Sequence, residues 1–162
     1  MLDQLQEVLR QELSDLPDTA GVFRVALRLL LAAALGALLG YEREHRGKAA
    51  GVRTHMLVAM GATLFVLVPQ QAGASQSDLS RVIQGLTAGI GFLGVAAIVK
   101  GRDDTQIYGL TTAAGIWMTA AIGVAAGMGR EATAIFSTVL AFIVLRLVPH
   151  VPHPNGAPRD GE

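Results

Sequence analysis

The sequence contains no cysteine, few aromatic residues and few charges. Of its 162 residues, 5% are aromatic and 16% are Asp, Glu, Lys or Arg. The lack of cysteine excludes disulfides, thiol catalysis and thiolate metal sites. The charged fraction is well below the roughly 25% of an average soluble protein. The 13 basic residues equal the 13 acidic ones, so charge gives no reason to expect a nucleic-acid partner.

Long uncharged runs take the place of the missing charges. Residues 82–99 and 105–129 contain no charged side chain, and each run is long enough for a helix across a hydrocarbon layer of about 30 Å. Shorter apolar runs occupy the rest of the chain and need their flanking residues to complete a span. The pattern predicts an all-α, polytopic membrane bundle in a lipid bilayer. Its five helices are expected at about 21–41, 54–68, 82–99, 107–127 and 132–148.

The two ends of the chain differ from this 21–148 transmembrane domain. Residues 1–17 have leucines at helical spacing, which predicts a short amphipathic helix whose leucine stripe packs against neighbouring helices or a second subunit. Residues 149–162 are rich in Pro, Gly and polar side chains without periodicity. They are predicted to be a disordered tail.

Lys and Arg gather in alternate connections of this topology. They are most frequent between the first and second helices, between the third and fourth, and after the fifth. By the positive-inside rule, this asymmetry predicts that the amino terminus lies outside and the carboxyl terminus in the cytoplasm.

The segment GIGFLG, residues 89–94, has the glycine spacing of a dinucleotide-binding turn. That motif requires a preceding strand and an acidic residue about 20 positions further on, and neither is present in the sequence. We therefore expect no dinucleotide and no other cofactor. Glycines four residues apart instead allow two helix backbones to approach closely in lipid. A helix-packing role is predicted for Gly36, Gly40, Gly85, Gly89, Gly91, Gly94, Gly123 and Gly127.

Polar residues near the first helix are the main candidates for ligand or partner binding. Arg28 lies about two turns into the membrane, where its side chain either snorkels to the headgroups or contacts a partner in the bundle. The densest polar stretch is GYEREHRGKAAGVRTH, residues 40–55. Spacings of four residues predict surface ion pairs there: Glu42–Arg46 and Glu44–Lys48. Glu42 and Glu44 are only weak candidates for metal ligands, because residues two apart do not share a helical face.

Nothing in the sequence favours an enzyme. There is no Ser, His and Asp set, no zinc-ligand helix and no phosphate-binding loop. Trp117 falls near the middle of its predicted span, away from the interfacial belt, and is expected to pack within the bundle.

Three blocks of sequence resemble the membrane domain of the MgtC/SapB family. They are RLLLAAALGALLGYEREHRGKAAGVRTHMLVAMGATLF (28–65), RVIQGLTAGIGFLG (81–94) and GLTTAAGIWMTAAIGVAAGMG (109–129). The likeness spans roughly residues 22–148. Family members often read GFLGAG where this chain has GFLGVA at residues 91–96, and longer members carry an additional soluble domain.

The resemblance implies a bacterial inner-membrane protein associated with growth under low Mg²⁺ and, in pathogens, with survival inside host cells. It implies a non-catalytic regulator that binds a membrane partner such as ATP synthase, and we expect a homo-oligomer. The alternative is a transporter for Mg²⁺ or a small solute. The positions that match the family motifs outside the glycines are Glu42, Arg43, Glu44, Arg53, Thr54 and His55.

Overall fold

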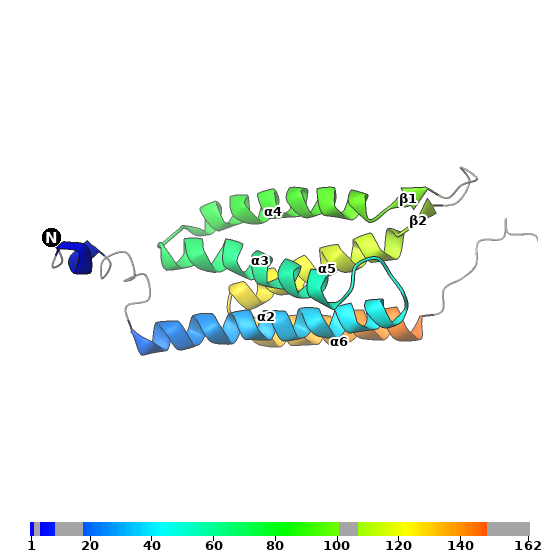
Figure 1. The fold of residues 1–162 in the computed structure, drawn as a ribbon, viewed down its shortest axis with the longest axis horizontal. Helices are drawn as coiled ribbons and strands as arrows, with labels where there is room; N and C mark the ends of the chain where they lie inside the picture. Colours follow the sequence, from blue (N-terminus) through cyan, green and yellow to red (C-terminus); the bar gives the residue numbers. More distant parts are fainter. Residues whose placement is uncertain (2–3, 9–17, 101–106, 149–162) are drawn as a thin grey trace, which may run out of the picture.

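The structure is a computed structural model that describes residues 1, 4–8, 18–100 and 107–148. Five long helices and one short antiparallel strand pair make up the bundle (Figure 1). In chain order they are α2 (Thr19–His45), α3 (Val52–Gln71), α4 (Gln76–Ala96), β1 (Val99–Lys100), β2 (Ile107–Tyr108), α5 (Leu110–Gly127) and α6 (Glu131–Leu147). The all-α fold class is therefore confirmed.

Four helices are long and apolar enough to cross a membrane: α2, α3, α4 and α5. The fifth predicted span corresponds to α6, which has 17 residues, the lower end of the length that a span requires. Residues 4–8 are helical, and Leu5 is exposed, so this part of the predicted amphipathic helix is not buried by the bundle. The remainder of that helix and the predicted tail lie outside the described residues.

The helices run up and down in three layers. Figure 1 shows α2 and α6 side by side, α3 and α5 in the middle, and α4 on the far side. Two groups of buried aliphatic side chains hold these layers together. One joins α2 to α3, α5 and α6 around Leu39 and Ile122, and the other joins α3, α4 and α5 around Ile90 and Ile116.

Glycines on α2 and α5 lie directly against the backbone of α3. A Cβ at Gly36 would sit 2.6 Å from the carbonyl oxygen of His55, and one at Gly40 would sit 2.6 Å from the Cα of Val52. On α5, Gly123 and Gly127 face the carbonyl oxygens of residues 59 and 63 in the same way. Only a residue without a side chain allows this approach, which brings α3 into contact with both neighbours.

The glycines of α4 differ from the expectation of close packing within the chain. A Cβ at Gly85, Gly89 or Gly91 would have nothing within 4 Å, and one at Gly94 would make only ordinary contact with Ala113. The reason is the position of α4, which has helices on one side only.

The boundary between the third and fourth predicted spans also differs. Helix α4 ends at Ala96 and α5 begins at Leu110, so the residues expected to extend these helices form the β1–β2 pair instead. Gly109 has φ of +91°, and a Cβ there would sit against the carbonyl oxygen of Ala97. The left-handed backbone and this close contact bring the end of α4 beside the start of α5, and both features require glycine.

The prediction for Trp117 was wrong. Its side chain is half exposed and lines a shallow groove between α4 and α5. The groove remains open because small residues, Ala120 and Ala121, follow Trp117 on α5.

Candidate functional site

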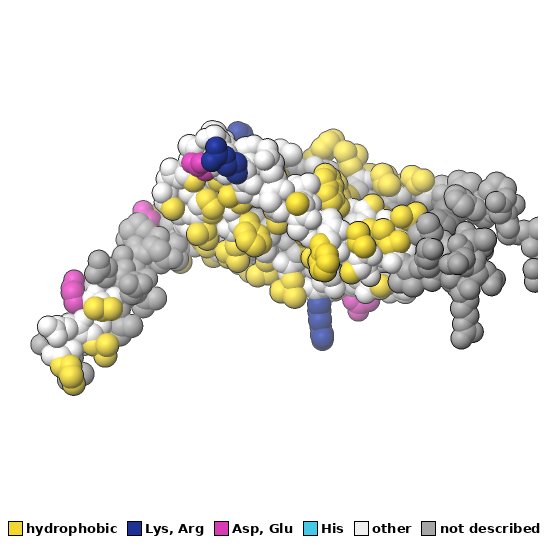
Figure 2. Space-filling model, turned by 90° about the horizontal axis from the view of Figure 1, so that it is seen from above, with side chains coloured by type: hydrophobic (Ala, Val, Ile, Leu, Met, Phe, Trp, Pro, Cys, Tyr) yellow, Lys and Arg dark blue, Asp and Glu magenta, His cyan; other side chains and the backbone are white. Residues whose placement is uncertain are grey.

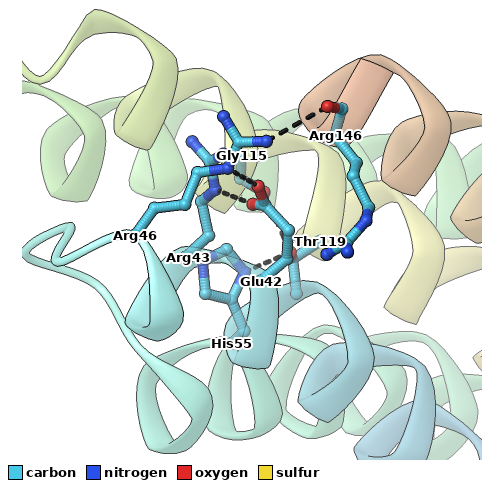
Figure 3. A network of polar contacts seen from close by, with 7 residues as sticks. All are labelled: Glu42, Arg43, Arg46, His55, Gly115, Thr119 and Arg146. Carbon is cyan, nitrogen blue, oxygen red and sulfur yellow. Dashed lines mark hydrogen bonds and ion pairs between the residues drawn. The ribbon is translucent and has the colours of Figure 1, made fainter.

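The last turns of α2 carry a cluster of three charged side chains. The Nε of Arg43 donates to Glu42 Oε2 at 2.5 Å, and the Nε of Arg46 lies 2.6 Å from Glu42 Oε1 (Figure 3). Each carboxylate oxygen is thus held by one guanidinium group. Basic side chains in a last turn also interact favourably with the carbonyl end of a helix dipole.

This Glu42–Arg43–Arg46 cluster is largely buried. The side chains of Glu42 and Arg43 are 2% and 3% exposed, whereas that of Arg46 is 43% exposed. The predicted Glu42–Arg46 pair is present, but it is not a surface pair. Spacing along a helix could not show this, because the burial comes from neighbouring helices: the start of α3 packs on Gly40, and α6 ends beside Arg46.

His55 lies beside the cluster in the core of the bundle. Its side chain is fully buried, and Nδ1 is 2.7 Å from the hydroxyl oxygen of Thr119 on α5. Because that hydroxyl donates to the carbonyl of Gly115 at 2.8 Å, it accepts from His55 Nδ1–H. This assigns the proton to Nδ1 and leaves Nε2 buried without a hydrogen-bond partner among the described residues. The His55–Thr119 bond joins α3 to α5.

Arg46 connects the cluster to α6. Its Nη2 donates to the main-chain carbonyl of Arg146 at 3.1 Å (Figure 3). That carbonyl belongs to the last turn of α6, where main-chain acceptors have no partner within the helix. The cluster and His55 therefore bring together α2, α3, α5 and α6 at one end of the bundle.

Glu44 has a different role from Glu42. Its Oε2 accepts from the main-chain N–H of Val52 at 2.8 Å, at the first residue of α3, where Gly51 provides no side-chain cap. No ion pair joins Glu44 to Lys48 among the described residues, so the predicted surface pair is not formed. Glu44 instead stabilises the start of α3 across the α2–α3 loop.

The other motif residues do not join the cluster. Arg53 and Thr54 are exposed, although they precede the fully buried His55 in sequence. Residues adjacent in a helix point about 100° apart, so only one of the three can face the bundle core.

Arg28 lies at the opposite end of the bundle. Its Nη1 donates to the carbonyl of Gly127 at 2.8 Å, and its Nε lies 3.7 Å from Glu131 Oε1. The guanidinium thus stabilises the carbonyl end of α5 and pairs with the first residue of α6. A Cβ at Gly129 would meet the guanidinium nitrogen. Arg28 therefore contacts partners within the bundle. Gly129, in the α5–α6 turn, has φ of +72°, a left-handed backbone conformation that favours glycine.

The described part of the chain contains no group of three or more His, Asp or Glu side chains placed to hold a metal ion. Both oxygens of Glu42 contact arginines, and one oxygen of Glu44 accepts from a main-chain N–H. A cleft of about 390 Å³ lies against α4. None of its lining residues belongs to the Glu42–Arg43–Arg46 cluster. They are Gln76, Leu79, Ser80, Ile83, Gln84, Thr87 and Met128.

Sequence reasoning did not identify two of the residues that complete the site. They are Thr119 and Arg146, which belong to no motif of the sequence. No local signal marks either one, because Thr119 contacts His55 across 64 positions and Arg146 contacts Arg46 across 100.

Four helices among the described residues are long and apolar enough to cross a membrane, and the buried Glu42–Arg43 pair lies at one end of their bundle. These features define a polytopic α-helical membrane protein. The sequence profile of the MgtC family matches residues 29–153, and the chain belongs to the MgtC family. This confirms the likeness found in the sequence.

Curated relatives support the same assignment. Protein SrpB of Synechococcus elongatus is 42% identical over 132 residues, covering 75% of this chain and 72% of that protein. The putative magnesium transporter YhiD of Escherichia coli K12 is 40% identical over 128 residues, and protein MgtC of Salmonella typhimurium is 41% identical over 128 residues. These alignments cover 75% and 77% of this chain, but only 59% and 54% of those two relatives. No solved structure gives a significant match.

Proposed function

We propose that this protein is a non-catalytic regulator in the bacterial inner membrane. It contributes to Mg²⁺ and ion homeostasis by binding another membrane protein, such as ATP synthase, and changing its activity. The link to magnesium is supported by the name of one relative, a putative magnesium transporter. The observation that carries the regulator proposal is the outward face of α4.

Helix α4 packs on one side and is open on the other. Leu79 and Ile90 are buried toward the bundle, whereas Gly85 and Gly89 have open space around them and Phe92 is 79% exposed. Figure 2 looks onto this side of the molecule and shows hydrophobic side chains spread over a mostly uncharged surface, with charged side chains in a few places. Glycine in a helix costs about 1 kcal/mol relative to alanine. Contact with another helix backbone offsets that cost, whereas contact with lipid does not.

This face offers a docking surface for a second copy of the chain and for a helix of the partner. The test is the double change Gly85→Leu with Gly89→Leu, which fills the open face. We expect it to reduce both the oligomer mass in mild detergent and the amount of protein that co-purifies from native membranes. Gly61→Leu is the matched control, because Gly61 also has open space around it but lies on α3. An unchanged mass and an unchanged set of co-purified proteins would contradict the proposal.

The interior polar groups also favour a regulator over a channel for cations. The hydroxyls of Thr63, Thr119 and Thr138 donate to carbonyls one turn back in their own helices at 2.8–2.9 Å. Glu42 is held by two guanidinium groups. The hydroxyls are hydrogen-bonded and both Glu42 oxygens are ion-paired within the chain itself. A cation in transit requires oxygen ligands that face a shared path.

The alternative, a transporter for Mg²⁺ or a small solute, is favoured by the name of the relative YhiD and by the polar side chains, Gln84 and Thr87 among them, in the mainly apolar cleft against α4. Uptake of Mg²⁺ into proteoliposomes with an internal magnesium dye distinguishes the two functions. We expect no uptake above that of empty liposomes. Uptake that Glu42→Gln abolishes would overturn the regulator proposal.

We further propose that the end of the bundle with the Glu42–Arg43–Arg46 cluster faces the cytoplasm. The support is the excess of Lys and Arg in the connections at that end. The absence of cysteine makes the test direct, since a single introduced thiol is the only one present. In intact spheroplasts, a membrane-impermeant maleimide should label Ala74→Cys but not Lys48→Cys. The reverse pattern would invert the orientation.

A further inference from the structure

The Glu42–Arg43–Arg46 cluster carries one uncompensated positive charge. Two guanidinium groups share a single carboxylate, and each carboxylate oxygen already contacts one Nε. In the ranges 18–100 and 107–148 no second Asp or Glu lies within ion-pair distance of either arginine. Glu42 and Arg43 neutralise each other in the interior, so the surplus charge lies on Arg46, whose side chain is 43% exposed. The cluster as a whole is net positive and attracts one more anion.

The hydrogen-bond donors show where that anion would bind. Arg43 is 97% buried, yet only its Nε has a partner among the described residues. Arg46 uses Nε and Nη2, and its Nη1 has no partner in the described part of the chain. In Figure 3 the free terminal nitrogens of both arginines extend to the same side of the Glu42 carboxylate. Two converging guanidinium groups match an anion with several acceptor oxygens.

The position of the cluster makes such an anion accessible. It lies at the end of the bundle where α2 and α6 terminate, and the 43% exposure of the Arg46 side chain leaves an approach from outside. The nearby carboxylate of Glu44 is held at the start of α3 by Val52 N–H. Basic pockets between the ends of membrane helices are suited to phosphate-bearing headgroups.

We propose that Arg43 and Arg46 together bind a phosphate group, carried either by an anionic phospholipid or by free phosphate. The phosphate oxygens accept from the unused guanidinium N–H groups and supply the missing negative charge. Glu42 positions the two guanidinium groups by holding their Nε atoms.

The experiment measures thermal unfolding of the delipidated full chain in a neutral detergent, at constant ionic strength. One arm adds inorganic phosphate, and a second adds short-chain phosphatidylglycerol, with short-chain phosphatidylcholine for comparison. Each arm is repeated with Arg43→Gln and with Arg46→Gln. Arg46 is half exposed, so its variant tests the site even where Arg43→Gln does not fold. Arg81→Gln is the matched control, because its side chain is 80% exposed at the start of α4, at the other end of the bundle.

We expect a rise in the unfolding temperature with one of the two phosphate probes. A response to phosphatidylglycerol alone identifies a lipid headgroup, and a response to inorganic phosphate without lipid identifies a free anion. The apparent affinity should fall about tenfold or more in Arg46→Gln, as expected for the loss of a charge-assisted contact, and stay unchanged in Arg81→Gln. No response to either probe, or an equal response in wild type and Arg46→Gln, would overturn the proposal.

Discussion

The substitution Gly123→Ala is expected to separate α3 from α5. The added Cβ would lie 2.3 Å from the carbonyl oxygen of Ala59 and 2.9 Å from the Cβ of Ala62. Ordinary van der Waals contact begins near 3.4 Å, so the two helices must move apart by about 1 Å. The closest obstacle is main chain, which no rotamer change can remove.

The energetic cost has two parts. Overpacking at a helix interface typically costs about 1–3 kcal/mol, and a gap of about 1 Å forfeits up to half of the dispersion energy of the atom pairs beside it. The shift also strains the hydrogen bond from Thr63 Oγ1 to the Gly123 carbonyl, 2.8 Å long, whose one proton is shared with the Ala59 carbonyl at 2.9 Å. This bond contributes at most about 1 kcal/mol. The higher helix propensity of alanine returns about 1 kcal/mol. We expect Gly123→Ala to lower the free energy of unfolding by about 2 kcal/mol.

Unfolding by sodium dodecyl sulfate in dodecyl maltoside micelles, followed by circular dichroism, measures this change. Gly61→Ala is the matched control: Gly61 lies in α3, and a Cβ there has nothing within 4 Å. It should leave the unfolding midpoint unchanged or raise it slightly. If Gly123→Ala proved as stable as Gly61→Ala, the close backbone contact between α3 and α5 would be refuted.

Three further changes test the polar contacts, with the same assay. Arg28→Gln removes the bond to the Gly127 carbonyl, 2.8 Å long, and should cost about 1–3 kcal/mol because the donor is charged. Thr119→Val removes the acceptor of the buried His55 ring at 2.7 Å, leaves Nδ1–H unsatisfied, and should also cost about 1–3 kcal/mol. Glu44→Ala removes the only side-chain acceptor described at the start of α3 and should cost about 1 kcal/mol.

Two of these changes, Thr119→Val and Arg28→Gln, have a control elsewhere in the chain. Thr87→Val removes a hydroxyl that is exposed and bonds only within its own helix, so it should change stability by less than about 0.5 kcal/mol. Arg81→Gln removes an exposed arginine whose nearest carboxylate is 4.0 Å away, and it should be neutral. Equal effects of Thr119→Val and Thr87→Val would argue against the His55 contact. Likewise, an unchanged free energy of unfolding in Arg28→Gln would argue against the contacts of Arg28 with the end of α5 and the start of α6.

The helices could be predicted because their signal is local. A run of about 20 uncharged residues identifies a membrane span whatever surrounds it, and the glycine pairs of α2 and α5 are visible as four-residue spacings. The boundary between α4 and α5 was less predictable. Residues 97–99 and 107–109 continue the apolar runs, and only the β1–β2 pairing and the contact of Gly109 with Ala97 show that they leave the helices.

The site was predictable in its residues but not in its contacts. The sequence marks residues 40–55 as the main polar stretch, and the structure places Glu42, Arg43 and His55 from that stretch in the interior. The same stretch also contains Arg53 and Thr54, which are exposed. Local spacing treats all of these residues alike, because it does not specify which face of a helix meets another helix.

The amino-acid sequence by itself determined that this chain is a membrane bundle of the MgtC/SapB type, because hydrophobicity, helix length and family motifs are properties of contiguous residues. Only the tertiary structure decided that Glu42 is buried between two arginines, that His55 bonds to Thr119 and that the glycines of α4 remain open. Those facts depend on which helices are neighbours. That choice is made by close packing between segments that lie up to 100 residues apart.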